Sequence, residues 1–381
     1  MTFVFPRRDS VVADIVLIAW RRVDTLRACL ESLLAMNDAP PFGLRIVANG
    51  ATEEVREFLR SDVDGAVIVE RAENIGFGGG CNAAAAGSAA RYLVFLNDDT
   101  VVEPHWLSAL VAAAEAGGAD AFASVLLDAE GRVAEAGARI LADTNPIPWG
   151  AGLAVPQARA LGLLEPRQID YGSAAALLVD RQLFERLGGF DLGYSPAYYE
   201  DVDLCFRITA AGKGVRLVPT ATVTHYTGAS TRTQGWFLQF AVQNARSVFA
   251  ARWRKTLASA PSIDAPVEEL VAVDSSELTE GRGIQLTPGT AESPTFALRI
   301  ARTYSRWLEV ALDDVHGRIE DFHRGQLEAE AETERIRQES LHSTEATRAR
   351  AQELHLQIDS LISANPVNVL RWWLRARRAR R

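Results

Sequence analysis

Residues 1–255 predict an α/β fold in which a mostly parallel sheet carries helices on both faces. Short apolar, β-branched segments alternate with amphipathic helical segments at the spacing of βα units. The first such segment, 15–19, reads Ile-Val-Leu-Ile-Ala, which is typical of a buried strand. Turn residues such as Asn49-Gly50 separate the segments. Hydrophobic residues make up 48% of the 381 residues, so a sizeable core is available.

Each apolar segment predicts a strand, and each segment with apolar residues at 3–4 spacing predicts a helix. Strands are expected at 15–19, 44–48, 66–70, 92–96, 174–179, 215–218 and 221–224. Helices are expected from Asp24, acting as an N-cap, and over 53–59, 82–90, 106–116, 181–187, 200–210 and 237–253. The pattern weakens between residues 128 and 168, where we expect a loop region that covers the substrate.

The composition changes near residue 256. Residues 256–294 are rich in Ser, Pro, Glu, Asp and Gly, which predicts a linker. Residues 295–362 predict helix, either a weakly specified coiled coil through which the chain self-associates or a solvated arm. Residues 363–381 hold a Trp-Trp pair flanked by arginines. This tail favours peripheral contact with an anionic membrane surface over a solvated or protein-docking segment.

Charge, cysteine content and hydropathy limit the class of protein. The formal net charge of −9 argues against general nucleic-acid binding. Cys29, Cys81 and Cys205 are far apart and form no metal-binding pattern, which fits a reducing compartment. The sequence has neither the ~18 consecutive apolar residues of a spanning helix nor the apolar stretch of a signal peptide. We therefore expect a cytoplasmic protein that contacts the inner face of the cell membrane only at its surface.

The acid pair Asp98-Asp99 directly follows the strand expected at 92–96. In open α/β sheets the carboxyl ends of the strands form the ligand-binding edge. Two adjacent carboxylates are costly unless a cation compensates their charge, and a divalent metal that carries substrate phosphates would do so. The alternative is an ordinary turn, since Asn and Asp are common after strands. We favour a metal-dependent enzyme that acts on a diphosphate substrate.

A second acidic cluster, Glu200-Asp201-Val202-Asp203, and the single His225 follow about a hundred residues later. Asp201 is well suited to act as a general base. Asp203 is expected to support the helix start or a neighbouring loop. The alternative is that these acids only stabilise a helix N-terminus. His225 is either a hydrogen-bonded structural residue or a metal ligand. The glycine-rich segment 76–80 lacks the pattern of a P-loop and is expected beside the donor pocket.

Seven motifs follow one another along residues 13–255. They are Ile15–Arg22, Val47–Gly50, Asn74–Asn82, Leu96–Thr100, Gly188–Asp191, Tyr199–Arg207 and His225. Each motif alone is weak, but the ordered set resembles family 2 glycosyltransferases of the GT-A fold, closest to the bacterial rhamnosyltransferase-like members. The resemblance implies a GT-A domain over 1–255 with a C-terminal helical extension. It also implies an inverting enzyme of cell-surface polysaccharide synthesis, which moves a sugar from a nucleotide-diphosphate donor (dTDP-rhamnose-like or UDP-linked) to a hydroxyl of a glycan or lipid-linked acceptor.

The same resemblance implies a role for individual residues. Asp99 and His225 would bind Mn²⁺ or Mg²⁺, and Asp201 would be the catalytic base. Tyr199 and Glu200 would lie on the acceptor side. The implied donor-binding residues are Ala19, Trp20, Arg22, Asn49, Asn74, Gly79, Asn82, Asn97 and Asp98.

Two departures from the family pattern bear on function. Ala48 stands where the family usually has an Asp that contacts the nucleobase. The segment Gln243–Arg246 is followed by Ser247, so the Gln-x-x-Arg-Trp signature of processive synthases is not met. The second departure favours addition of one or a few sugars. Two other interpretations remain open: a nucleotidyltransferase, or a catalytically degenerate scaffold of a glycan assembly complex, which Ala48 favours.

Overall fold

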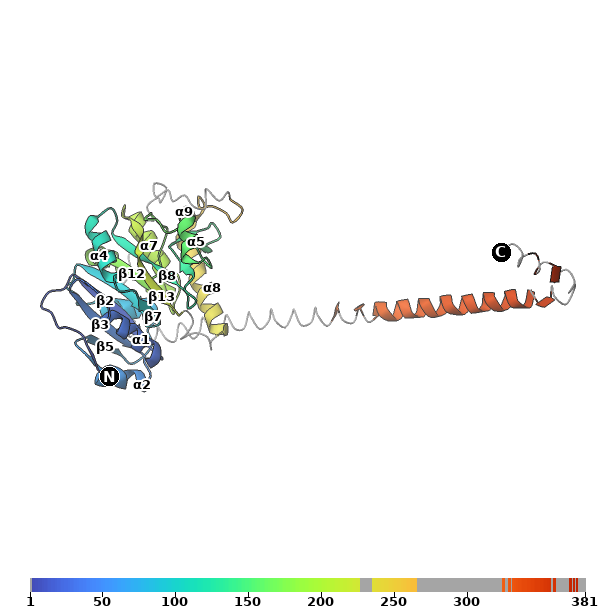
Figure 1. Cartoon of the computed structure of the whole chain (residues 1–381), viewed down its shortest axis with the longest axis horizontal. Helices are drawn as coiled ribbons and strands as arrows, with labels where there is room; N and C mark the ends of the chain where they lie inside the picture. Colours follow the sequence, from blue (N-terminus) through green and yellow to red (C-terminus); the bar gives the residue numbers. More distant parts are fainter. Residues whose placement is uncertain are drawn as a thin grey trace. The chain divides into compact units, whose positions relative to one another are not determined.

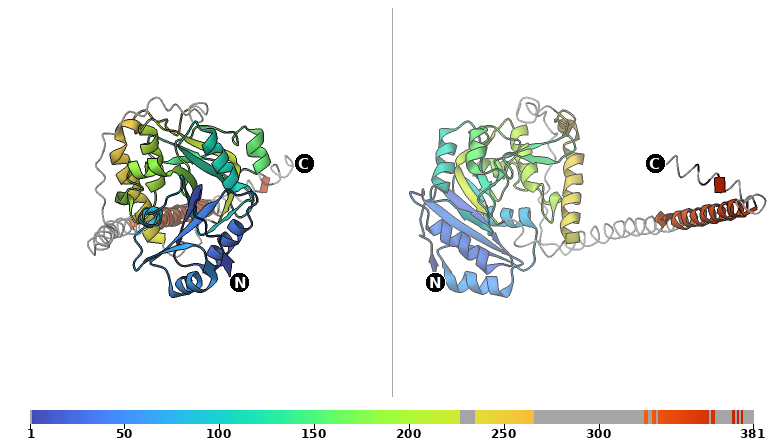
Figure 2. Two further views of the ribbon diagram at one scale, coloured as in Figure 1. Left: turned by 90° about the vertical axis from the view of Figure 1, so that its left-hand side faces the viewer. Right: turned by 45° about the vertical axis from the view of Figure 1, so that its right-hand side comes forward.

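The computed structural model describes residues 2–226 and 235–265, and in the C-terminal part residues 324–325, 328–329, 331–357, 359–360, 370–371, 373 and 375. The chain divides into two units, Met1–Tyr304 and Ser305–Arg381. Within the described residues, the first unit is built on a nine-stranded sheet with helices on both faces (Figures 1 and 2). This is the predicted α/β fold with helices on both faces of the sheet, followed by helical residues near the C-terminus.

The sheet has the strand order β5-β3-β2-β6-β12-β8-β13-β7, and β9 pairs with β8. β5, β3, β2 and β6 are parallel to one another, whereas β12 runs antiparallel to both β6 and β8. The strands are β2 Ala13–Ala19, β3 Phe42–Asn49, β5 Val67–Arg71, β6 Tyr92–Asn97, β7 Thr100–Val102, β8 Ala121–Leu127, β9 Val133–Glu135, β12 Ala176–Asp180 and β13 Val215–His225. Two short pairs lie apart from it, β1 Phe3–Val4 with β4 Val63–Asp64 and β10 Ala138–Ile140 with β11 Pro146–Pro148.

The helices form one layer on each side of the sheet (Figure 1). Along β2, Ile15 and Leu17 belong to one buried cluster and Val16 to the other, because successive strand side chains point to opposite faces. Residues of α1, α2 and α4 fill the first cluster, and residues of α3, α6, α7 and α8 fill the second. The helices are α1 Val23–Leu34, α2 Glu53–Asp62, α3 Phe77–Ala85, α4 Trp106–Ala116, α5 Val155–Ala160, α6 Arg181–Arg186, α7 Glu200–Ala210, α8 Gly235–Arg252 and α9 Arg254–Leu257, with the 3-10 turn η1 at Leu192–Tyr194.

Most predicted elements are present, and the differences have physical reasons. The helix expected over 82–90 is wrong: α3 begins at Phe77, inside the glycine run. A Cβ on Gly78 would lie 2.9 Å from the Cβ of Phe190, so close packing requires glycine there despite its poor helix propensity. Asp24 lies in the first turn of α1, whose N-cap is Arg22.

Two expected element assignments also need correction. The strands expected at 215–218 and 221–224 form the single strand β13, whose register against β8 shifts between Val218 and Thr222. The weakly patterned region 128–168 is not a plain loop, because it contains β9, β10, β11 and α5. The α/β unit also continues past residue 255: Leu257 is buried, and the backbone N–H of Ala142 donates to the carbonyl of Pro261 at 2.9 Å.

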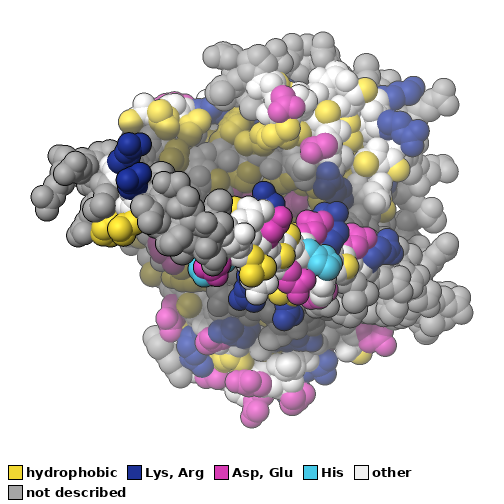
Figure 3. All heavy atoms as spheres, turned by 90° about the vertical axis from the view of Figure 1, so that its right-hand side faces the viewer, with side chains coloured by type: hydrophobic (Ala, Val, Ile, Leu, Met, Phe, Trp, Pro, Cys, Tyr) yellow, Lys and Arg dark blue, Asp and Glu magenta, His cyan; other side chains and the backbone are white. Residues whose placement is uncertain are grey.

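The described residues 331–357 of the second unit are helical, and their side chains are exposed. Ion pairs three residues apart, such as Glu332–Arg335, link acidic and basic side chains along this helix. Acidic and basic side chains are interspersed on the face drawn in Figure 3. No helix among the described residues combines the length and apolar character needed to cross a membrane. Most of the expected linker and most of the basic tail lie outside the described residues, so those expectations, like the coiled coil, stay predictions.

Candidate active site

A cavity of about 670 Å³ opens at the carboxyl ends of β2, β3 and β6. This is the edge of an α/β sheet where ligands bind. Its walls bring together segments that are far apart in sequence: the two acidic clusters, the loop before α3, the 171–175 segment and one face of α8. The polar and aromatic lining residues are Trp20, Asn49, Asn74, Phe77, Asn97, Asp98, Asp99, Asn145, Tyr171, Ser173, Tyr198, Tyr199, Glu200, Asp201, His225 and Arg246.

Pairing of β7 with β13 brings His225 to the acid pair. In this antiparallel pair Thr100 lies opposite His225, and the backbone N–H of Tyr226 donates to the carbonyl of Asp99 at 2.9 Å. His225 Nε2 then lies 3.1 Å from Asp99 Oδ1 and 3.3 Å from Asn97 Nδ2. The imidazole and the carboxylate that the resemblance assigns to a metal are therefore adjacent.

Three buried carboxylate oxygens that belong to cavity-lining residues have no hydrogen-bond partner: Asp98 Oδ2, Asp99 Oδ1 and Glu200 Oε2. The close approach of His225 does not satisfy Asp99 Oδ1, because the geometry is not that of a hydrogen bond. Burial, reinforced by the charge of Asp99, raises the pKa of Asp98 to about 8. Such unsatisfied buried acids are costly and call for a cation or donor that a ligand brings.

The donor set fits a divalent metal held jointly with a substrate. Among the described residues, no group of three or more His, Cys, Asp or Glu side chains is arranged to enclose an ion. The adjacent pair Asp99 Oδ1 and His225 Nε2 offers one oxygen and one nitrogen ligand. Mg²⁺ and similar ions are commonly held by one or two protein groups, with substrate phosphates and water completing the shell.

Asp201 lies at the start of α7, held by backbone groups. Its Oδ2 accepts a hydrogen bond from the N–H of Ala174 at 3.1 Å, and its Oδ1 accepts one from Val202 at 2.9 Å. Burial raises the pKa of the Asp201 carboxyl, and these hydrogen bonds oppose that rise. A fixed carboxylate with a raised pKa that lines the cavity is suited to take a proton from a bound hydroxyl.

Tyr199 and Glu200, expected on the acceptor side, also line the cavity. The hydroxyl of Tyr199 donates to the carbonyl of Thr144 at 3.0 Å, which ties α7 to the segment between β10 and β11. Glu200 is 5% exposed, and burial, with the nearby Asp201 charge, raises its pKa well above the usual range. The structure thus places both residues on the wall that also holds Asp201.

Asn49 and Asn74 line the cavity, and their side chains form hydrogen bonds within the loop before α3. Asn49 Oδ1 accepts from the N–H of Ile75 at 3.0 Å, and its Nδ2 donates to the carbonyl of Gly76 at 3.0 Å and to Asn74 Oδ1 at 3.2 Å. Asn74 Oδ1 also accepts from the N–H of Gly76 at 2.9 Å. These contacts shape the entrance to α3. Trp20 also lines the cavity, and the guanidinium of Arg21 lies 3.9 Å from the centre of its ring.

Four predicted donor residues are not part of the cavity lining: Ala19, Arg22, Gly79 and Asn82. Ala19 is fully buried, and the side chain of Arg22 pairs with Asp24. Gly79 faces Ile75, and the amide of Asn82 is used by the backbone of Phe190, whose carbonyl accepts at 2.8 Å and whose N–H donates at 2.9 Å. Their roles in donor binding stay predictions. Because they lie outside the cavity lining, such roles would be indirect, through the position of residues that do line it.

The sequence did not single out several residues that line the cavity, which are Tyr171, Ser173, Leu238, Val242 and Arg246. Arg246 had a usable signal, since it occupies the Arg position of the incomplete Gln-x-x-Arg-Trp signature. Its Nε donates to Thr144 Oγ1 at 2.7 Å, which fixes α8 beside the cavity. The others carry no local pattern that marks them as functional.

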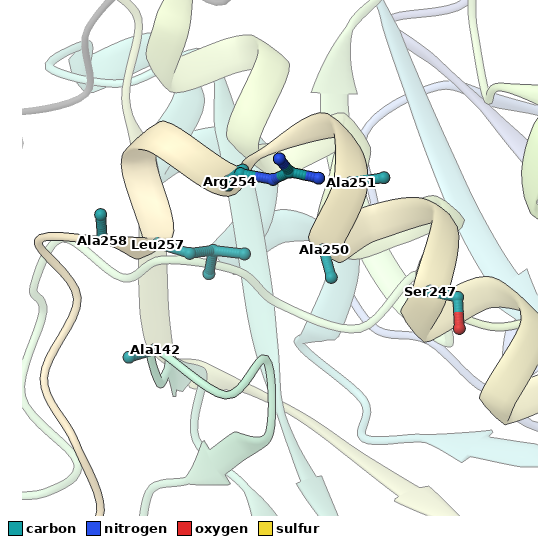
Figure 4. A pocket seen from close by; sticks show the side chains of 7 residues that line it. All are labelled: Ala142, Ser247, Ala250, Ala251, Arg254, Leu257 and Ala258. Carbon is teal, nitrogen blue, oxygen red and sulfur yellow. The ribbon is translucent and has the colours of Figure 1, made fainter.

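A second hollow, of about 540 Å³, lies between the 142 loop and helices α8 and α9 (Figure 4). Small apolar side chains such as Ala142, Ala250 and Ala258 line it, together with Ser247 and Arg254. Its described lining contains no carboxylate or imidazole. This described lining therefore lacks the acidic and imidazole groups that line the first cavity.

Two solved structures show a distant likeness to the chain. One is a GalNAc-T7 crystal structure with UDP, GalNAc and Mn²⁺ (13% identity, TM-score 0.47, 65% of this chain and 50% of that one). The other is the mannosyltransferase PcManGT from Pyrobaculum calidifontis in complex with GDP-Man and Mn²⁺ (14% identity, TM-score 0.48, 67% of this chain and 70% of that one).

Curated relatives are more similar in sequence. The O-antigen biosynthesis protein RfbC of Myxococcus xanthus is 30% identical over 233 residues, which are 60% of this chain and 18% of that protein. The rhamnosyltransferase WbbL of Escherichia coli K12 is 32% identical over 96 residues, which are 25% of this chain and 35% of that protein. An uncharacterized protein of Sinorhizobium fredii, y4gI, is 27% identical over 236 residues, 60% of this chain and 26% of that protein. The matched region thus spans well under half the length of each relative.

The predicted family is confirmed over the region that carries most of the site. Residues 14–187 match the model of glycosyl transferase family 2, from β2 through α6. This segment includes the acid pair Asp98-Asp99 and the loop before α3, while Asp201 and His225 follow it in the same α/β unit. Residues 14–187 of the chain therefore match glycosyl transferase family 2, and a 96-residue stretch is similar to the rhamnosyltransferase WbbL.

Proposed function

We propose that the protein is an inverting, metal-dependent glycosyltransferase of cell-surface polysaccharide synthesis. It would move a sugar from a nucleotide-diphosphate donor, dTDP-rhamnose-like or UDP-linked, to a hydroxyl of a glycan or lipid-linked acceptor. The observation that carries the proposal is that Asp98, Asp99, Asp201 and His225 line one cavity at the carboxyl edge of the sheet. The names of RfbC and WbbL support a role in O-antigen-like polysaccharide synthesis.

The metal would be Mn²⁺ or Mg²⁺, held by Asp99 Oδ1 and His225 Nε2. When bound, it neutralises negative charge that develops on the leaving diphosphate. Support comes from the unpartnered oxygens of Asp98 and Asp99, which need a cation or donor. Asp98, with its raised pKa, is available to donate a hydrogen bond to ribose or diphosphate while it is protonated.

The transfer itself is a direct displacement at the anomeric carbon. The acceptor oxygen forms the new bond to this carbon, the bond to the diphosphate oxygen breaks, and the nucleoside diphosphate leaves with the electron pair. Asp201 takes the proton of the attacking hydroxyl, so attack from the face opposite the leaving group inverts the configuration. Fixing both substrates in one cavity supplies much of the remaining acceleration.

The C-terminal residues carry two further parts of the proposal. The arginine-rich tail would hold the enzyme at the inner face of the cell membrane, where a lipid-linked acceptor lies, and the helix around 331–357 would allow self-association. Each arginine near an anionic surface contributes about 1 kcal/mol. The exposed side chains of residues 331–357 leave that helix available to a partner helix.

A thermal-shift screen of nucleotide sugars with and without Mn²⁺ tests the proposal. A donor present at a hundred times its dissociation constant stabilises the native state by about 2.7 kcal/mol. The cognate donor should raise the melting temperature more with Mn²⁺ than with EDTA, and slow hydrolysis should release nucleoside diphosphate. Release of pyrophosphate would instead indicate a nucleotidyltransferase. Absence of donor binding and hydrolysis would favour a degenerate scaffold, for which Ala48 is the one supporting feature.

A further inference from the structure

Glu135, the last residue of β9, is a buried carboxylate that no motif of the family singled out. It is 9% exposed. Its Oε1 accepts a hydrogen bond from the backbone N–H of Ser173 at 2.9 Å, and its Oε2 accepts one from the hydroxyl of Tyr171 at 3.2 Å. Both partners line the cavity. Glu135 therefore supports one wall of the site from behind.

The segment supported by Glu135 continues directly to the proposed base. The next N–H along the chain, that of Ala174, donates to Asp201 Oδ2 at 3.1 Å, and the Ser173 side chain also hydrogen-bonds Asp201. Residues 171–174 thus join two carboxylates, the buried Glu135 on one side and the partly buried Asp201 on the other. A shift of this segment would move the donors that orient Asp201.

The segment has little room to adjust if one of these contacts is lost. A Cβ on Gly172 would lie 2.2 Å from the Cβ of Ala123 on β8, so the backbone is pressed against the sheet. The N–H of Ala138 donates to the carbonyl of Tyr171 at 3.0 Å, which fixes the start of the segment on β10. Glu135 completes this frame at the two residues that face the cavity.

Charges from several elements act on Glu135. Asp201 raises its pKa, whereas the hydrogen bonds from Ser173 and Tyr171 and the charge of His225 lower it. The thiol of Cys205 also faces it from α7. Burial is the largest cause, and the pKa of Glu135 is raised to about 7. Because such coupling is reciprocal, an ionised Glu135 makes Asp201 a stronger base.

We propose that Glu135 is a positioning residue, which holds the 171–174 segment and thereby the Asp201 carboxylate in the orientation that takes a proton from the acceptor. The inference rests on the proposed role of Asp201 as base. It assigns to Glu135 no contact with either substrate. Its effect is on proton transfer and the pH range of transfer, not on donor affinity.

The test compares Glu135→Gln with Glu135→Ala and a matched control, Asp170→Asn. Gln keeps the size of Glu135 and an acceptor for Ser173 but removes the charge, whereas Ala removes both. Asp170 is a partly buried carboxylate next to Tyr171, and its hydrogen bonds go to Arg139 and to the N–H of Ile140 rather than to Asp201. Hydrolysis of the UDP- or dTDP-linked sugar selected by the thermal-shift screen is followed as a function of pH with Mn²⁺ present.

We expect Glu135→Gln to bind the donor within twofold of wild type but to lose at least tenfold in kcat. Its acid limb should move to lower pH, because Asp201 loses a neighbouring negative charge. Glu135→Ala should lose more, and Asp170→Asn should stay within twofold. Wild-type kcat and an unmoved pH profile in Glu135→Gln would overturn the inference.

A second readout separates failure of the inference from failure of the proposed function. Carbon-13 NMR of Asp carboxyls, assigned with Asp201→Asn, measures the titration of Asp201 without any substrate. The inference expects the Asp201 titration to move to lower pH in Glu135→Gln and to stay unchanged in Asp170→Asn. If wild type hydrolyses no donor, the proposed function fails, and this titration still decides whether Glu135 acts on Asp201.

Discussion

Asp99 Oδ1 and His225 Nε2 lie 3.1 Å apart, yet no hydrogen bond joins them. Strand pairing enforces this approach, since β7 and β13 place Thr100 opposite His225. A carboxylate oxygen and an imidazole nitrogen held this close offer two ligands of the kinds that divalent metals accept. The pair therefore links the topology of the sheet to the chemistry proposed for the cavity.

Replacement of either member of the pair should remove metal-dependent donor binding. Asp99→Asn and His225→Ala each delete one proposed ligand, and we expect the Mn²⁺-dependent part of the donor-induced thermal shift to be lost. Isothermal titration of the donor with Mn²⁺ and with EDTA measures the effect. Asp64→Asn, an exposed acid paired with Arg7, is the control and should bind like wild type. Full activity of wild type in EDTA would contradict the metal role.

Asp201→Asn should abolish transfer while it leaves donor binding intact. The amide is nearly isosteric and can still accept the N–H of Ala174, but it cannot take the acceptor proton. We expect a loss of two to four orders of magnitude in kcat, roughly the contribution of a general base. Single-turnover measurements of nucleoside diphosphate release measure this loss of rate. Parallel loss of donor affinity in calorimetry would remove the support for the base assignment.

The fold was predictable where each segment's own residues decide its structure. Ile15–Ala19 and Tyr92–Leu96 are apolar throughout because both faces of these strands are buried, and the strands form there. The start of α3 was predicted too late in the sequence. Glycine has a low helix propensity, whereas packing requires the helix to run through the glycines. A Cβ on Gly80 would lie 2.9 Å from Ile18 Cδ1, so only the assembled sheet explains the glycine.

The site was predictable only where acids stand together in sequence. Asp98-Asp99 and Glu200-Asp201 could be found because adjacent carboxylates are costly and therefore conspicuous. Glu135 could not, since its partners Tyr171 and Ser173 lie 36 and 38 residues away and nothing local marks it. Asn82 was expected at the donor because of its motif, but its amide is used to hold Phe190.

Asp203 should be a stability residue, in line with the expectation that it supports the helix start. It is fully buried and accepts from Tyr194, Trp253, Arg252 and Arg207, which joins α7 to η1 and α8. Its pKa is lowered: burial opposes ionisation, but the two arginines outweigh it.

Asp203→Ala removes the carboxylate that pairs with Arg207 and one of the two that pair with Arg252, and should cost about 3–5 kcal/mol of unfolding free energy. Urea denaturation measures it. The exposed control Asp64→Ala should cost about 0–1 kcal/mol. Equal losses in the two variants would contradict a structural role for the buried network.

The stability of the metal-free protein should fall as pH rises from about 4 to about 8. The pKa of Glu135 is raised from 4.5 to about 7 and that of Asp98 from 3.8 to about 8, chiefly by burial. For an acid whose pKa is higher in the folded state, the native state binds more protons than the unfolded state between the two values, so stability is greatest below the lower value and is lost through this window. Above about pH 8 these two groups add no further slope.

Thermal denaturation in EDTA across this range measures the loss of stability. Each unit by which folding raises a pKa corresponds to about 1.4 kcal/mol of unfolding free energy. Asp98→Asn and Glu135→Gln each remove one titrating group and should flatten the curve, most visibly toward pH 8. Mn²⁺ with a nucleoside diphosphate should restore stability at pH 8, because the positive charge of the cation then compensates the ionised acid pair. A melting temperature that rises steadily from pH 5 to 8 in EDTA would mean that these carboxyls are ionised and satisfied in the native state without a ligand.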